Sequence, residues 1–189
     1  MVNRNTYITR LYEAFGTFDL QFCPFFGIIN MMIYEIGDKV IHCRNGVSTI
    51  VGTTEMGERQ YFVIRALRGD NENIYVPFIG AENIIRSVMT VEQADELLHG
   101  LASIEKEFNP NTKQRRDAYK RRLGSGNVLD IAYLFRQKCL YQEFPENVKL
   151  GPSDVDMLEY ASNILLDELS LTYNVDRDKV EEFILPKIK

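Results

Sequence analysis

Apolar and polar side chains alternate over residues 34–86, which is the period of β-strands that bury one face. The clearest alternation lies in residues 36–53 (IGDKVIHCRNGVSTIVGT), where two short strands, 39–42 and 47–51, are predicted on either side of Asn45-Gly46. Asn-Gly is the dipeptide most typical of tight hairpin turns. We therefore expect a β-hairpin here, with the rest of the chain arranged around it.

Further short strands are predicted after this hairpin. The segments are a polar stretch with a turn at Gly57 (53–59), an apolar strand (61–67), a turn (68–71) and two short strands (74–77 and 84–85). Pro77 marks the end of a strand or an edge, because proline cannot donate a ladder hydrogen bond. Four or five short strands joined by tight turns indicate a small Tudor-like or SH3-like β half-barrel.

At Thr90 the period changes to that of helices, and Thr90 and Gln93 have the spacing of a capping box. The positions that follow at helical spacing are Ala94, Leu97, Leu98, Leu101, Glu105 and Phe108. Later helices are predicted over residues 112–123, along a face of Val128, Ile131, Ala132, Phe135 and Cys139, over residues 153–173, and over a last stretch that Asp176 caps and Pro186 ends. The expected fold class is α+β, a half-barrel followed by an all-α domain of about five helices.

Three segments are predicted: an N-terminal extension (1–31), a strand domain (32–88) and a helical domain (89–189). The extension is rich in aromatic side chains without a sustained period. Three alternatives stay open for it: a helix that covers the sheet, a segment without stable structure, or sequence ahead of a translation start at Met31 and Met32.

The charge of the chain limits how it could meet nucleic acid. The 189 residues carry a net charge of −5, with 45% hydrophobic and 26% charged residues, as in ordinary soluble proteins. Non-specific affinity for phosphates grows with the number of cations brought to them. Any nucleic-acid contact must therefore come from a local patch.

The cysteines favour neither a disulfide framework nor a metal site, since Cys23, Cys43 and Cys139 are widely spaced and odd in number. His42 and Cys43 point to opposite faces because neighbours on a strand alternate, so we interpret both as structural. The longest apolar run, residues 22–33, is interrupted and too short to span a bilayer. We expect a cytoplasmic protein without cofactor or metal.

The densest cluster of charge is KQRRDAYKRR, residues 113–122, on the second predicted helix. Tyr119 and Leu123 define its inward face. The cations that flank this face are Lys113, Arg115, Arg116, Lys120 and Arg122. The helix could offer them to a phosphate backbone, or it could be a solvated face with one structural arginine.

Glu168 falls at the centre of the apolar face of the long helix, not on its polar side. A buried carboxylate without a partner costs several kcal/mol. We therefore predict a structural ion pair with an arginine of the second or third helix, with Arg115, Arg116 and Arg136 as candidates. No phosphate-loop, hydrolase-elbow, metalloprotease or paired-cysteine zinc motif occurs, so an enzyme is not expected.

Motifs in both halves fall in an order typical of one family. The strand half contains IGDKVI (36–41) with Asn45-Gly46, YFVI (61–64) and Val76-Pro77; the helical half contains Arg115, Leu123, Ser125-Gly126-Asn127, Ala132, Arg136, Leu150, Met157-Leu158, Ala161, Leu165 and Glu168-Leu169-Ser170-Leu171. From Met32 onward the chain resembles the CarD/CdnL family of bacterial transcription regulators, whose N-terminal module is also similar to the RNA-polymerase-interacting domain of transcription-repair coupling factor.

The resemblance implies a transcription regulator that binds two partners. The strand domain would dock on the RNA polymerase β subunit, partly through an edge strand, with Met56, Ile74 and Tyr75 as expected contacts. The helical domain would contact promoter DNA without reading its sequence, weakly when alone, and so stabilise the open complex during initiation. The expected DNA contacts are Thr112, Lys113, Arg115, Arg116, Lys120 and Arg122. No membrane and no small-molecule substrate is implied.

The chain departs from the family at two of these positions. It contains no tryptophan, and Thr112 stands where the family typically sets a tryptophan wedge in the minor groove. Threonine cannot replace an apolar wedge that unstacks a base step. Tyr75 stands where some relatives carry a polymerase-contacting arginine. The alternative function is therefore a protein-interaction adaptor that binds RNA polymerase without direct DNA contact.

Overall fold

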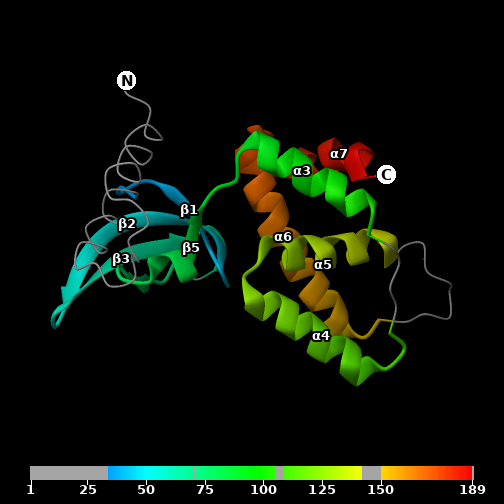
Figure 1. Ribbon diagram of the computed structural model, residues 1–189, viewed down its shortest axis with the longest axis horizontal. Coiled ribbons are helices and arrows are strands. Elements are labelled where there is room, and N and C mark those ends of the chain that lie inside the picture. The colour runs from blue at the N-terminus through cyan, green and yellow to red at the C-terminus, as the bar shows by residue number, and fades with distance from the viewer. Residues whose placement is uncertain (1–33, 70, 105–108, 142–149, 189) are drawn as a thin grey trace, which may run out of the picture.

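The computed structural model describes residues 34–69, 71–104, 109–141 and 150–188. The expected N-terminal extension, Glu105 and Phe108 lie outside the described residues. Figure 1 shows a β-sheet built from the first part of the chain beside a group of helices built from the second. We call these the strand module (residues 34–88) and the helical module (residues 90–188). The predicted α+β class is confirmed.

The strand module is an antiparallel five-stranded sheet with the order β4-β3-β2-β1-β5. Its elements are β1 (Lys39–His42), β2 (Gly46–Met56), β3 (Arg59–Ala66), β4 (Ile74–Pro77), the 3₁₀ helix η2 (Ala81–Asn83) and β5 (Ile85–Ser87). The first four strands follow one another as hairpins, and β5 returns to pair with β1. This is the predicted Tudor-like half-barrel.

The strand β2 is longer than the alternation predicts. It pairs with β3 from Ser48 opposite Ala66 to Met56 opposite Arg59, because β3 offers partners to its polar half as well. A register shift between Ile50 and Gly52 bends the strand. The first hairpin turn occupies residues 43–45, one position earlier than predicted.

One face of the sheet forms a small core. Its buried residues are Val40, Ile50, Phe62, Ile64, Val76, Phe78, Ala81 and Ile85. The Phe62 and Phe78 rings lie with centroids 4.2 Å apart, and Tyr34 meets Phe62 edge-on. The predicted alternation is confirmed by β3, in which Phe62 and Ile64 are buried and Arg65 is exposed.

The helical module contains five helices in the described residues. They are α3 (Val91–Ala102), α4 (Thr112–Ser125), α5 (Val128–Tyr141), α6 (Pro152–Tyr173) and α7 (Arg177–Ile184), with a final 3₁₀ turn η3 (Leu185–Ile188). The predicted capping box of Thr90 and Gln93 is confirmed. Asp176 is the N-cap residue of α7, as predicted, although its side chain makes no capping hydrogen bond. No described helix has the length and apolar character needed to cross a membrane.

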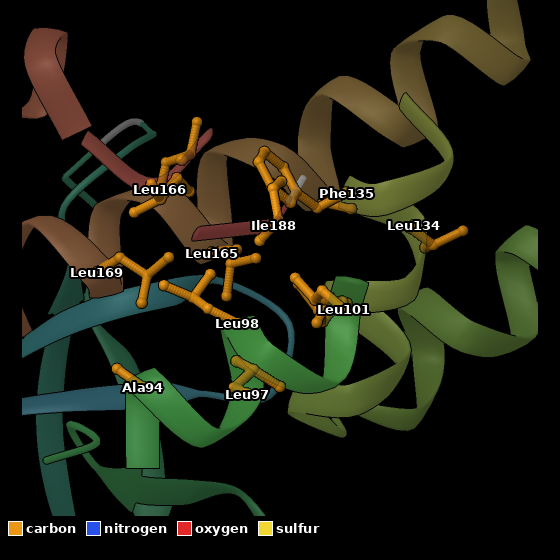
Figure 2. Close-up of a cluster of buried hydrophobic side chains, with 14 of the residues drawn as sticks. Ala94, Leu97, Leu98, Leu101, Leu134, Phe135, Leu165, Leu166, Leu169 and Ile188 are labelled. Carbon is orange, nitrogen blue, oxygen red and sulfur yellow. The ribbon is translucent and has the colours of Figure 1, made fainter. Parts of the chain in front are cut away.

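The helices surround α6, whose apolar face forms the centre of the second core. Figure 2 shows Leu98 and Leu101 of α3 beside Leu165 and Leu169 of α6, and Leu97, Leu166, Phe135 of α5 and Ile188 belong to the same buried cluster. In Figure 1 one end of α6 also lies beside the sheet. This helix therefore serves both modules.

Candidate functional site

The basic helix α4 packs through a narrow inward face. Tyr119 is buried and Leu123 partly buried, as predicted. Arg115 shares that face, since it lies four residues before Tyr119, and it is 3% exposed. Its Nη2 donates to Asp154 Oδ2 at 2.6 Å and its Nη1 to the Asn109 carbonyl at 2.8 Å. The guanidinium of Arg115 is thus enclosed between α4 and α6 and is not presented to solvent, so the structure gives no support to its expected DNA contact.

Two further arginines of α4 form ion pairs within the protein while part of each side chain stays exposed. Arg116 lies with Nε 3.5 Å from Asp154 Oδ1 and keeps 37% of its side chain exposed. Arg122 donates to Asp130 at 2.5 Å, and its guanidinium lies 3.9 Å from the centroid of the Tyr133 ring. Both stabilise the docking of α4, and each presents only part of its charge to solvent.

Lys113 and Lys120 are the predicted contacts that project most freely. Both are exposed, and no ion pair involves either in the described residues. Seven residues separate them, so they lie on one side of α4 about 10 Å apart along the axis. Thr112 is exposed at the first position of the helix, after the capping residue Asn111. The structure thus brings Lys113 and Lys120 to one side of α4, with Thr112 exposed at the start of the helix.

The predicted docking residues lie at different places on the strand module. Tyr75 of β4 is 49% exposed and stands opposite Val63 on the outer face. Met56 is 44% exposed at the end of β2, where it pairs with Arg59. Ile74 is half-buried and packs on the core of the sheet. Only Tyr75 and Met56 are presented to a partner from the outer side.

Glu168 is neutralised by an arginine, but not by one from the predicted helices. Arg86 of β5 donates from Nη1 to Oε1 at 2.5 Å and from Nη2 to Oε2 at 2.7 Å. Oε1 also accepts the backbone N–H of Met89 at 3.1 Å. The prediction of Arg115, Arg116 or Arg136 as partner is therefore wrong, because this face of α6 is covered by the strand module.

Comparison with known families gives the same two-part division. A model described as the CarD-like/TRCF RID domain matches residues 34–89, and a model of the CarD C-terminal domain matches residues 96–185. The chain belongs to the CarD/CdnL family. Its domains are those of an RNA polymerase-interacting transcription factor, and the N-terminal one is of the type shared with transcription-repair coupling factor.

This CarD-family protein has a second ion pair between its modules that the sequence did not suggest. Arg68 in the turn after β3 donates to both carboxylate oxygens of Asp167, at 2.5 and 2.8 Å. Arg177 at the start of α7 binds Asp167 from the other side at 2.7 Å and reaches Asn163 at 2.9 Å. Asp167 is 4% exposed, whereas Arg68 and Arg177 keep 52% and 30% of their side chains exposed, so a buried carboxylate is held by two arginines that reach solvent.

Backbone contacts close the rest of the junction between the modules. A Cβ at Gly46 would lie 3.2 Å from Cγ1 of Ile164 on α6, so the backbone of the first hairpin packs directly on the Ile164 side chain. Gly126, at the end of α4, lies against Cys43 in the same way. The CarD-family modules therefore meet through close packing as well as through ion pairs.

His42 has a structural role in that hairpin. It is 8% exposed, and its Nδ1 accepts the backbone N–H groups of Arg44 at 3.2 Å and Asn45 at 3.1 Å. Burial, together with the nearby charge of Arg44, lowers the pKa of His42. A neutral imidazole is required for these bonds, which fits the structural interpretation. The described residues contain no group of ligands that could hold a metal ion.

Proposed function

We propose that this protein is a non-enzymatic regulator that docks on the RNA polymerase β subunit through the strand module and contacts promoter DNA through α4, so that the open complex is stabilised. The observation that carries the DNA contact is the placement of Lys113 and Lys120. They project from one side of a helix whose neighbouring face, with Arg115 and Tyr119, is fixed to the core. Because the helix is already ordered, it can bring cations to phosphates with little further loss of conformational entropy.

The edge strand β4 supports docking on polymerase. In the described part of the chain β4 pairs with β3 alone, which leaves its outer backbone groups available to an added strand. Tyr75 lies beside that edge, and tyrosine is enriched at protein interfaces. We assign the direct contacts to Tyr75 and Met56, and to Ile74 the role of holding β4 on the core.

Weak DNA contact suits a protein that is already tethered to polymerase. Two lysines with partial help from Arg116 and Arg122 give few phosphate contacts, and the chain as a whole is acidic. Tethering raises the local concentration of α4 near DNA to roughly the millimolar range. A contact too weak to act alone can then extend the lifetime of the melted complex.

The alternative adaptor, without DNA contact, is favoured by Thr112. Its short side chain opens α4 at the position of the family's tryptophan, and it cannot wedge a base step apart. The enclosure of Arg115 also removes one of the cations that the sequence offered. The adaptor would bind polymerase equally well and leave no footprint on DNA.

A pull-down with the β subunit tests the docking, and a promoter crosslink separates the two functions. Tyr75→Ala is expected to weaken β-subunit binding about tenfold or more, as for a central interface aromatic. Val155→Ala removes an apolar side chain of similar exposure, 48%, from α6 and is the matched control. If Tyr75→Ala and Met56→Ala/Tyr75→Ala are both pulled down as well as the control Val155→Ala, docking through the β4 edge is contradicted. At physiological salt, where phosphate contacts are weak, a photocrosslinker at Lys113 should label promoter DNA only when polymerase is present; no label would favour the adaptor.

A further inference from the structure

The turn between β1 and β2 belongs to the strand module but lies against the helical one. A Cβ on Gly126 would lie 3.1 Å from the Cα and 3.3 Å from the carbonyl oxygen of Cys43, so the turn meets the end of α4 at backbone distance. From α6, the Tyr160 hydroxyl donates to the carbonyl of Arg44. Figure 1 shows one end of α4 directed at the strand module. Both helices thus fix the position of this turn.

Arg44 presents an exposed cation at that corner. Its side chain makes no ion pair in the described residues, and its backbone is held on both sides, by Tyr160 and by His42. Lys120 and Arg121 precede Gly126 by six and five residues, which is about 8–9 Å along the helix axis. Arg44 therefore lies next to the C-terminal end of α4.

The charge along α4 and this corner is positive. The cations are Arg44, Lys113, Lys120 and Arg121, all exposed. Of the nearby carboxylates, Asp130 is bound to Arg122 and Asp154 to Arg115 and Arg116. Asp117 of α4 and Asp156, one turn before Tyr160 on α6, are exposed acids and offset two of these four charges. The surface keeps a clear positive excess although the whole chain is acidic.

We infer that Arg44 is a further contact for DNA phosphates, so that the duplex lies across the junction of the two modules and not on the helical module alone. From Lys113 to Gly126 α4 rises by about 20 Å, the span of about six phosphates on one strand. A row of cations along a straight axis fits the regular charge of a duplex. The inference rests on the proposed function and adds a strand-module residue to it.

Fluorescence anisotropy with a labelled duplex tests this inference on the full chain. Arg44→Ala is expected to weaken binding threefold to tenfold at low salt and to make the slope of log K against log salt less negative by about 0.9. Arg59→Ala removes an equal charge at the start of β3, next to the far end of β2, and its affinity for the duplex should stay within twofold of the wild type. Arg44→Lys should keep most of the affinity.

A Lys113→Ala/Lys120→Ala variant keeps the two questions apart. If it weakens binding while Arg44→Ala matches Arg59→Ala, the Arg44 contact is overturned and the α4 contact stands. If neither the α4 variant nor the Arg44 variant changes binding, or if the wild type does not bind the duplex at low salt, the α4 contact and the Arg44 contact are both overturned. If Arg44→Ala weakens binding to a labelled polyglutamate peptide as much as it weakens binding to the duplex, the surface binds polyanions in general and the DNA assignment is overturned.

Discussion

The guanidinium of Arg86 in β5 binds both carboxylate oxygens of Glu168 in α6, across 82 residues of chain and between the two modules. Glu168 is 1% exposed. Its neighbour Asp167 binds Arg68 of the strand module in the same two-pronged way. Two consecutive carboxylates of one helix thus hold two arginines of the strand module. This arrangement fixes where the β4 edge lies relative to α4.

Arg86→Ala is expected to lower the free energy of unfolding by about 2–3 kcal/mol. Removing one partner leaves a buried carboxylate without its cation, although water reaches Arg86, which is 36% exposed, and softens the loss. Urea denaturation measures the change. An Arg86→Met/Glu168→Met pair should recover much of it, since no charge then stays buried. A loss below about 0.5 kcal/mol in Arg86→Ala would contradict this role.

Arg115→Ala is expected to loosen α4 from the core. Asp154 is fully buried and would lose its closest cation, at a cost of about 3 kcal/mol. Amide hydrogen exchange should rise along α4 before the rest of the helical module opens. Arg121→Ala, an exposed arginine of the same helix, should change stability by less than about 0.5 kcal/mol. Equal effects of the two variants would show that Arg115 is not structural.

Gly126→Ala is expected to destabilise the junction by about 2–4 kcal/mol. The backbone φ is +66°, which costs an alanine about 1–2 kcal/mol, and the new Cβ would lie 2.5 Å from Cβ of Cys43. Gly57 has nearly the same φ, +64°, with nothing within 4 Å. Gly57→Ala should therefore show the backbone cost alone. Thermal melting of the two variants separates the overlap with Cys43 from the strain.

His42 should titrate below its ordinary pKa of 6.5, since burial disfavours the imidazolium and the charge of Arg44 adds to this. The unfolded chain then binds a proton before the folded chain does. Stability that is present above pH 6.5 should fall as the pH drops through the folded pKa. NMR titration of the imidazole measures the midpoint. A midpoint at or above 6.5 would rule out the neutral, hydrogen-bonded imidazole.

Local sequence patterns were enough for the elements of this fold. The Thr90–Gln93 box and the alternation of β3 each depend on residues close in the chain. The length of β2 could not be predicted in the same way. Its polar half is a strand only because β3 lies beside it.

The ion-pair partners of buried charged residues could not be predicted from the sequence for a related reason. The position of Glu168 on an apolar face shows that it needs a cation, but Arg86 lies in another module, and spacing cannot reveal which surface covers α6. Arg115 differs, since its i, i+4 and i+8 spacing with Tyr119 and Leu123 already placed it on the inward face. That pattern could have removed it from the DNA contacts.

The lifetime of the promoter open complex tests the central claim most directly. Lys113→Ala/Lys120→Ala should shorten it severalfold while β-subunit binding is unchanged, because the variant alters α4 and leaves the β4 edge intact. Lys39→Ala/Lys179→Ala removes the same charge elsewhere and should leave the lifetime as it is. A wild-type lifetime in the Lys113→Ala/Lys120→Ala variant would contradict DNA contact through α4.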